Sequence, residues 1–308
     1  MSKYRSYVLP AAILAGLFLH HWCAYLAWLS PFLIFIMLLL NFTAVDMRQL
    51  HLSRTSIRIM LYQAVTSIAC YFIVSKLFHN ELLAEGLLVG ILCPVACSVV
   101  ATACILGANR ESVTEYTVWG NLMIALVAPF YFTFIGNHQD YTFWQSFLLI
   151  QQRLAPTIAL PFFVALLLQS VWRKGNDFLC RFKDYSFYLW AVLLLITLGQ
   201  TIDFIFLHGK GNGLNILALA IASALTCFFH FAVGKLSGKK HGDSIGEGQL
   251  MGQKNTALGI WMATTYLNPL TSVFMAFYSV WQNLFNSWQI WHHDRMLAAH
   301  PCEPIRKS

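Results

Sequence analysis

The sequence predicts an all-α polytopic membrane protein, and three features of the chain support this fold class. Hydrophobic residues make up 58% of the 308 positions and charged residues only 11%, well below the ~25% charged of a soluble domain. Long apolar runs are separated by short polar loops, and most lysines and arginines lie in alternate loops. Because a span needs about 20 apolar residues, the chain has room for nine or ten helices in a lipid bilayer and almost no soluble domain.

The first half of the chain contains five expected spans, at residues 7–19, 25–45, 59–78, 81–107 and 112–136. The first could be a signal peptide, but His20-His21-Trp22 follows where a cleavage site would need small residues, so we interpret it as a span. Segment 137–154 mixes polar and aromatic residues and is expected to lie along the membrane surface. The second half contains five more spans, at residues 155–172, 185–208, 214–233, 246–269 and 270–291.

The fourth and ninth spans are both interrupted. Gly90 and Cys93-Pro94 interrupt the fourth, and proline removes a helical hydrogen bond. The ninth, GEGQLMGQKNTALGIWMATTYLNP, carries three glycines and then the polar run 253–256. The two spans hold the same place in two sets of five, and a second set of five must enter the membrane upside down. This pattern predicts two inverted repeats, approximately 1–137 and 138–292, within one transport domain that ends in a cytoplasmic tail at 293–308.

The distribution of basic residues predicts the orientation. With the N-terminus inside, the inner loops and tails hold 16 of the 20 lysines and arginines. The positive-inside rule then places both termini in the cytoplasm, and we expect the inner membrane of a bacterium. The net charge of +7 lies in these loops, so it does not indicate a nucleic-acid partner. The eight cysteines have no metal-site spacing, so no metal or cofactor is expected.

Three stretches carry a resemblance to a known family. The run GQKNTALGIWMATTYLNP resembles the G-M-Q-N-x-x-L-A motif and later Asn-Pro of the bile acid:sodium symporter family. The run CPVACSVVATACILGANRESVTEYT is similar to that family's C-P-G-G-T-A-S-N broken fourth helix and the helix after it. Gln63, in LYQAVTSIACYFIVSKLF, falls where the family has a glutamine on the third span.

The resemblance implies a fold of ten helices, in which spans three to five and eight to ten form a core and spans one, two, six and seven form a panel. The two broken helices, four and nine, would cross in the core. Many members carry organic anions together with sodium. The resemblance therefore implies a secondary transporter for a small organic anion, a binding partner of this chain, and not an enzyme.

This chain departs from the family at several sodium ligands. Leu250 stands where sodium-coupled members have a glutamate, and only a shift in register could give that role to Glu247. Lys254 replaces the motif's glutamine. The family's Ser-Asn pair aligns with Val99-Val100, which leaves Ser98 as the nearest hydroxyl. Half of the expected sodium cage is missing.

An ammonium group among the remaining oxygen atoms would repel sodium and could satisfy those oxygens itself. Lys254 is therefore expected to act as a tethered substitute for the cation, or to pair with an anionic substrate. Loss of hydration also makes a lysine hold its proton less tightly, so a proton, or no ion, is favoured over sodium for coupling. The candidate substrate or ion site comprises Gln63, Ser98, Thr117, Asn121, Gln253, Lys254, Asn255 and Thr256.

Simpler roles exist for several of these residues. Gln63, Thr117, Asn121 and Lys254 could serve only in structural hydrogen bonds. Asp203 and Glu115 are less favoured proton carriers, because one belongs to the implied panel and the other lies near the inner surface. The histidine pairs 20–21 and 292–293 are interpreted as interfacial rather than metal-binding. A polar strip on the tenth span could line the substrate path or bond to the crossing: Trp281, Gln282, Asn283 and Asn286.

Two other classes of function stay open. A membrane-embedded enzyme would usually present acidic or His/Asp clusters at one membrane face, and the short loops lack such a cluster. A transporter fold that binds a ligand without moving it could serve as a sensor. The missing sodium ligands are compatible with that possibility.

Overall fold

The computed structural model describes residues 2–46, 50–96, 98–135, 142–208 and 211–299. Within these ranges the chain folds into thirteen α-helices with short 3-10 turns, so the predicted all-α class is confirmed. The α-helices are α1 (Ser2–Tyr25), α2 (Ser30–Thr43), α3 (Arg54–Phe78), α4 (Glu81–Leu92), α5 (Val99–Ile105), α6 (Arg110–Ile135), α7 (Phe143–Val171), α8 (Arg173–Cys180), α9 (Ser186–His208), α10 (Gly213–His241), α11 (Ser244–Gly252), α12 (Thr256–Tyr266) and α13 (Ser272–Ala299).

Several helices have the length and composition of membrane spans. Among the described residues, five helices qualify on their own, within α3, α6, α7, α9 and α10. A sixth candidate arises if Leu14–Tyr25 and Ala27–Thr43, which are bent by 78°, form one span. Large apolar side chains also face outward, such as Phe18 at 84% exposure and Leu214 at 82%. Such a surface suits lipid rather than water, and it supports a multi-pass membrane protein.

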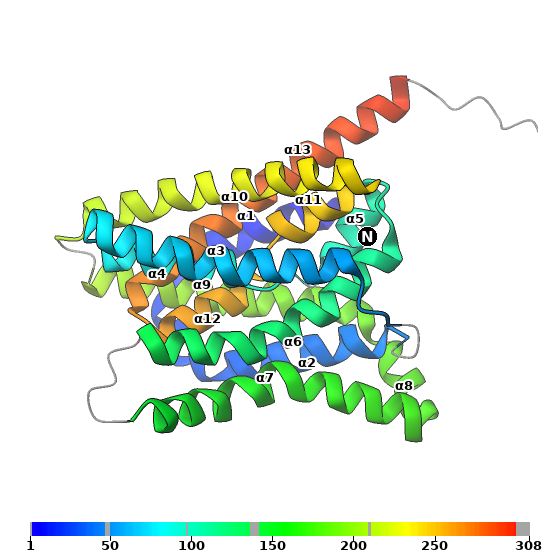
Figure 1. Ribbon diagram of the computed structural model, residues 1–308, viewed down its shortest axis with the longest axis horizontal. Helices are drawn as coiled ribbons and strands as arrows, with labels where there is room; N and C mark the ends of the chain where they lie inside the picture. Colours follow the sequence, from blue (N-terminus) through cyan, green and yellow to red (C-terminus); the bar gives the residue numbers. More distant parts are fainter. Residues whose placement is uncertain (1, 47–49, 97, 136–141, 209–210, 300–308) are drawn as a thin grey trace, which may run out of the picture.

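Most of the long helices run roughly side by side, and α13 crosses them obliquely (Figure 1). One end of the bundle contains the turns at 50–53, 106–109 and 242–243 and the segment 172–185 with α8, and contacts there include Ser53 with Glu115 and Arg58 with His241. We call it the basic end, because the lysines and arginines of these turns and of the adjoining helix ends lie there. At the opposite end, Asn80 contacts Asn215 and Glu85 contacts Thr271.

Packing divides the bundle into two groups of helices. In the first group α1 packs on α9, and α2 packs on both α7 and α9. In the second group α3 packs on α4, and α10 packs on α4, α11 and α13. Contacts of α6 with α7 and of α12 with α9 join the two groups. The broken segments, α4 with α5 and α11 with α12, both belong to the second group.

Glycines allow α11 to lie directly against α10. Gly234 and Gly238 are one turn apart on α10, and a Cβ atom at either position would collide with the backbone of α11 or of the turn before it. Small residues at this spacing are a common device for close helix contact in membranes. The Asp243 side chain caps α11 by accepting a hydrogen bond from Gly246 N at 2.7 Å. The sequence thereby fixes where α11 begins and how it lies on α10.

Segment 137–154 differs from its expected place along the membrane surface. From Phe143 onward it is the first part of α7, which continues through Pro156 and Pro161 as one helix. A capping box of Thr142 and Gln145 starts the helix. One face is buried along its whole length, at Ser146, Ile150, Leu154, Ile158, Pro161 and Ala165. The polar residues between these positions made the apolar stripe hard to recognise in the sequence.

Other expected boundaries also shift. Gly90, Gly246, Gly248 and Gly252 were expected to interrupt spans four and nine, but all four lie inside helices, where they permit close packing. The α13 helix continues past 291 to Ala299, so the first part of the expected tail is helical. The rest of that tail, 300–308, and the expected repeat boundary at 137–138 lie outside the described residues.

Candidate functional site at the crossing of two chain breaks

The two interruptions meet inside the bundle. The segment between α4 and α5 and the segment between α11 and α12 form an isolated antiparallel bridge between Val95 and Lys254. Ala96 N donates to Gln253 O at 3.1 Å, and Asn255 N donates to Pro94 O at 2.8 Å. Chain segments about 160 residues apart therefore satisfy one another's backbone groups, which have no water to bond to in a membrane interior.

Local sequence explains both breaks. Pro94 has no N–H, and the residue before a proline disfavours helical geometry, so α4 ends at Leu92. After the second break, the Asn255 side chain accepts from Leu258 N and caps α12. Cys93 Sγ donates to Asn255 O at 3.1 Å and joins the two breaks once more.

Lys254 lies at the centre of the crossing and is completely buried. Its Nζ donates to Ile91 O at 2.8 Å, in the last turn of α4. The carbonyl end of a helix carries partial negative charge and favours a cation. Among the described residues, none of the ion pairs includes Lys254. The ammonium therefore interacts with the end of a half-helix rather than with a carboxylate.

Residues of α13 hold the crossing from one side. Gln282 Oε1 accepts from Lys254 N at 2.8 Å, and Gln282 Nε2 donates to Lys254 O at 3.1 Å. Tyr278, one turn earlier, donates to Gly252 O at 3.0 Å. Of the two roles open for the polar strip, Gln282 thus takes the second and bonds to the crossing. Asn283 and Trp281 donate instead to Ser279 O and Ala220 O.

The predicted site residues fall into two sets. Gln253 to Thr256 form or adjoin the crossing, and Gln253 Nε2 donates to Ser98 Oγ at 3.1 Å. Gln63 lies on α3 and accepts from Tyr116 of α6 at 2.6 Å. Thr117 and Asn121 are stacked one turn apart on α6, and Asn121 Nδ2 donates to Thr117 O. The second set is thus held by bonds within and between α3 and α6, whereas Gln253 bonds to Ser98 at the crossing.

Three buried polar atoms near these residues have no partner among the described protein atoms: Gln63 Nε2, Asn121 Oδ1 and Gln253 Oε1. Unpaired buried groups are costly, and each one in a folded protein calls for an explanation. These atoms, one donor on α3 and two acceptors on α6 and at the crossing, are groups that a small polar ligand could satisfy.

A cavity of about 1040 Å³ leads from the basic end toward the crossing, and it reaches Ser98, Val100 and Thr117. It lies between α2 and α9 on one side and α5 and α6 on the other. Its charged lining is mixed, with Arg110 and Lys183 beside Asp46, Glu111 and Glu115. The remaining lining is mostly hydroxyl, amide and apolar. The cavity thus connects one end of the molecule with the region of the chain breaks.

A small apolar cluster fills the space beside the crossing on the α5 side. It contains Val95, Val99, Leu250 and Tyr116. Leu250 and Val99 are 1% and 0% exposed, so no water separates them from their neighbours. Glu247 is one turn away from Leu250 but forms an ion pair with Arg58 at 2.6 Å. A shift in register that would bring Glu247 to the crossing is therefore not present.

The other candidates lie elsewhere. Asp203 of α9 pairs with His20 of α1 at 2.7 Å. Glu115 accepts from Ser53 N and lines the cavity near the basic end. In the described part of the chain no group of three or more His, Cys, Asp or Glu side chains is arranged to hold a metal ion.

Sequence reasoning missed the roles of Tyr116, Tyr278 and Ile91. The only signal for Tyr278 is its spacing of four from Gln282, which places both on one face of α13. A backbone carbonyl such as that of Ile91 leaves no mark in the sequence.

No protein-family model matches the chain, and no curated protein matches it significantly. The structure accordingly defines a class rather than a family: an all-helical protein with five or six candidate membrane spans.

Proposed function

We propose that this protein is a secondary active transporter that moves a small organic anion across the cytoplasmic membrane by alternating access. The observation that carries the proposal is the crossing of two broken helices at the end of a cavity open toward the basic end. Broken helices expose backbone groups and helix ends in the membrane, and transporters use such places to bind solutes.

Three further features support a bile acid:sodium symporter-like plan. The two breaks lie at corresponding positions in the first and second halves of the chain, as expected for inverted five-helix repeats. The helices of the implied panel, α1, α2, α7 and α9, pack on one another, and both breaks lie in the other group. The described turns at 50–53, 106–109 and 242–243 lie at the basic end and those at 79–80 and 267–271 at the opposite end, an arrangement that suits alternating spans (Figure 1).

Sodium is not the expected coupling ion at the crossing. Leu250 and Val99, which align with sodium ligands in the family, lie in a buried apolar cluster, and neither side chain supplies an oxygen. Lys254 already places a positive group at the carbonyl end of α4, where it would repel a second cation. Since Lys254 is buried away from the cavity lining, it acts in this proposal as the tethered cation and not as the substrate's partner.

The cavity lining narrows the description of the substrate. Arg110 and Lys183 can attract an anionic group near the mouth, while Ser98 and Thr117 offer hydroxyl groups deeper in. The carboxylates of Asp46, Glu111 and Glu115 in the same lining would repel a compound with several negative charges. The proposed substrate is therefore a monoanion with polar and apolar parts.

The test is uptake of a labelled panel of organic monoanions into proteoliposomes, with sodium and pH gradients imposed separately. We expect uptake that needs no sodium. Val100→Trp should reduce it at least tenfold by filling the cavity, whereas Leu126→Trp, on the exposed face of α6, should leave it unchanged. Sodium-driven flux would overturn the assignment of Lys254. Saturable binding without flux would favour the sensor instead.

A further inference from the structure

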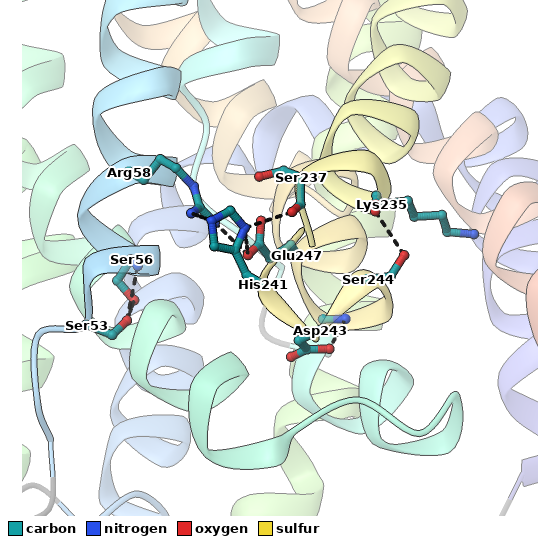
Figure 2. Close-up of polar contacts among 10 residues, drawn as sticks. Ser53, Ser56, Arg58, Lys235, Ser237, His241, Asp243, Ser244 and Glu247 are labelled. Atoms are coloured by element: carbon teal, nitrogen blue, oxygen red, sulfur yellow. Dashed lines mark hydrogen bonds and ion pairs between the residues drawn. The ribbon is translucent and has the colours of Figure 1, made fainter. Parts of the chain in front are cut away.

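A second polar cluster ties α3, α10 and α11 together at the basic end (Figure 2). Arg58 of α3 donates through one guanidinium nitrogen to Glu247 Oε1 at 2.6 Å. Its other terminal nitrogen contacts His241 Nε2 at 2.7 Å. His241 Nδ1 contacts Ser237 O at 2.8 Å and lies 3.6 Å from Glu247 Oε1. One arginine thus bridges a histidine and a carboxylate from two other helices.

The chemistry of these partners fixes the state of His241. A carbonyl oxygen such as that of Ser237 can only accept, so Nδ1 carries the hydrogen. Arginine can only donate, so Nε2 must present its lone pair to Arg58. Both conditions hold only for the neutral imidazole. The arrangement therefore fits a neutral imidazole whose hydrogen is on Nδ1.

A proton on His241 would disrupt this arrangement. Nε2–H would then face an N–H of Arg58, with two donors and two positive charges 2.7 Å apart. At the same time, the charged imidazole would gain attraction for Glu247, whose carboxylate is already within ion-pair distance. His241 and Arg58 would compete for one buried carboxylate.

Glu247 is placed to respond to that competition. Its side chain is 2% exposed, and its second oxygen, Oε2, has no partner among the described residues. His241 is 43% exposed, and both residues line a polar pocket of about 470 Å³ at the basic end. Asp243 also lines this pocket, while the ammonium of Lys235 points away from the cluster (Figure 2). Protons from the solvent can thus reach His241 without crossing the core.

We propose that His241 is a proton-binding site that displaces Arg58 from Glu247 and so unties α3 from α11. Because α11 leads directly into the chain break at 253–255, the proton controls how firmly that break is held. If the proposed transport function holds, pH at the basic end then sets the rate of transport.

The direct test needs no substrate. Melting temperatures of the purified protein in detergent are compared for Arg58→Gln, Glu247→Gln and the double variant, at about pH 8 and about pH 5.5, on either side of the histidine range. The comparison measures the coupling between Arg58 and Glu247, which is the part of their effects on melting temperature that does not add. At high pH we expect strong coupling, so that the double variant melts no lower than either single variant. At low pH the coupling should shrink to less than half. Equal coupling at both values would overturn the proposal.

His241→Gln separates the histidine from the carboxylate. Glutamine can accept from Arg58 but cannot take up a proton, so the coupling should persist at low pH in this background. Loss of coupling there would assign the proton to Glu247 and reject His241. His292→Gln, at an exposed position of α13, is the matched control and should behave like the wild type.

Uptake assays then separate this inference from the proposed function. Wild-type flux should change at least threefold with the pH on the side of the membrane that the basic end faces. Flux through the His241→Gln variant should not change with that pH. Absence of flux for every solute would reject the transporter, while the melting experiments would still decide the proton site. Flux with the same pH response in His241→Gln would reject the link between them.

Discussion

Two buried interactions of basic side chains hold the second packing group together, and they differ in partner and in access to water. Lys254 is fully enclosed and donates to a backbone carbonyl at the end of α4. Arg58 is partly exposed and is paired with a carboxylate and a histidine beside a polar pocket. The first site is closed to solvent, and the second lies beside a polar pocket at the basic end.

The two sites show how packing sets the access of solvent protons to a basic group in such a bundle. A cation that satisfies helix carbonyls in a dry crossing has no competitor, so it acts as part of the fold. A cation that shares a carboxylate with a partly exposed histidine has a neighbour that can compete for that carboxylate, as we propose for Arg58 and His241. The role of a buried basic side chain therefore depends on its partner and its access to water rather than on its residue type.

Reversing the charge at the crossing should have the largest effect. Lys254→Glu would place a carboxylate against carbonyl oxygens in a dry site, and an uncompensated buried charge costs about 3–5 kcal/mol. We expect loss of the monodisperse folded protein in size-exclusion chromatography. Lys254→Gln, which removes the charge but can still donate, should remain folded. Equal behaviour of the two variants would show that Lys254 does not act through its charge.

The second largest effect is expected for the hydrogen bonds that Gln282 makes to the backbone of Lys254. Gln282→Leu leaves the N–H of Lys254 without its partner and removes one of two donors to its C=O, which keeps Thr256 N; an unpaired buried group costs about 1–3 kcal/mol. Thermal unfolding should therefore shift down by several degrees. Asn283→Leu is the matched control, because Asn283 donates only within its own helix. If the hydrogen bonds of Gln282 contributed nothing to stability, Gln282→Leu and Asn283→Leu would have the same melting curve.

A smaller effect is expected where α11 rests on α10. A Cβ atom in Gly234→Ala would meet the carbonyl oxygen of Glu247, and overpacking costs about 1–3 kcal/mol. Displacement of α11 should also weaken the coupling between Arg58 and Glu247 at high pH. Gly213→Ala, with open space around it, should change neither the melting temperature nor the coupling.

The smallest effect is expected at the floor of the cavity. Ser98→Ala removes one hydrogen bond from Gln253, worth about 0.5–1.5 kcal/mol. Because Ser98 also lines the cavity, the apparent KM for uptake should rise more than the melting temperature falls. A change in stability with no change in KM would place Ser98 outside the substrate path.

The sequence located the breaks but not their contacts. Cys93-Pro94 and the run around Lys254 mark both interruptions, because proline and a polar run disturb a helix locally. That Lys254 would reach Ile91, and that Gln282 would bond to both backbone groups of Lys254, depends on partners up to 163 residues away. The start of α7 was misjudged for a related reason, since its buried stripe is recognisable only once α2 and α6 cover it.

The sequence by itself determined the helical class, the membrane character and the positions of the two breaks, because composition, hydrophobic length and proline act over a few residues. Only the tertiary structure decided which charge is enclosed and which is exposed to solvent. Lys254 and Arg58 are both basic residues near small polar ones in the sequence. Their environments differ because packing brings a helix end to the first, and a carboxylate, a histidine and a solvent-accessible pocket to the second.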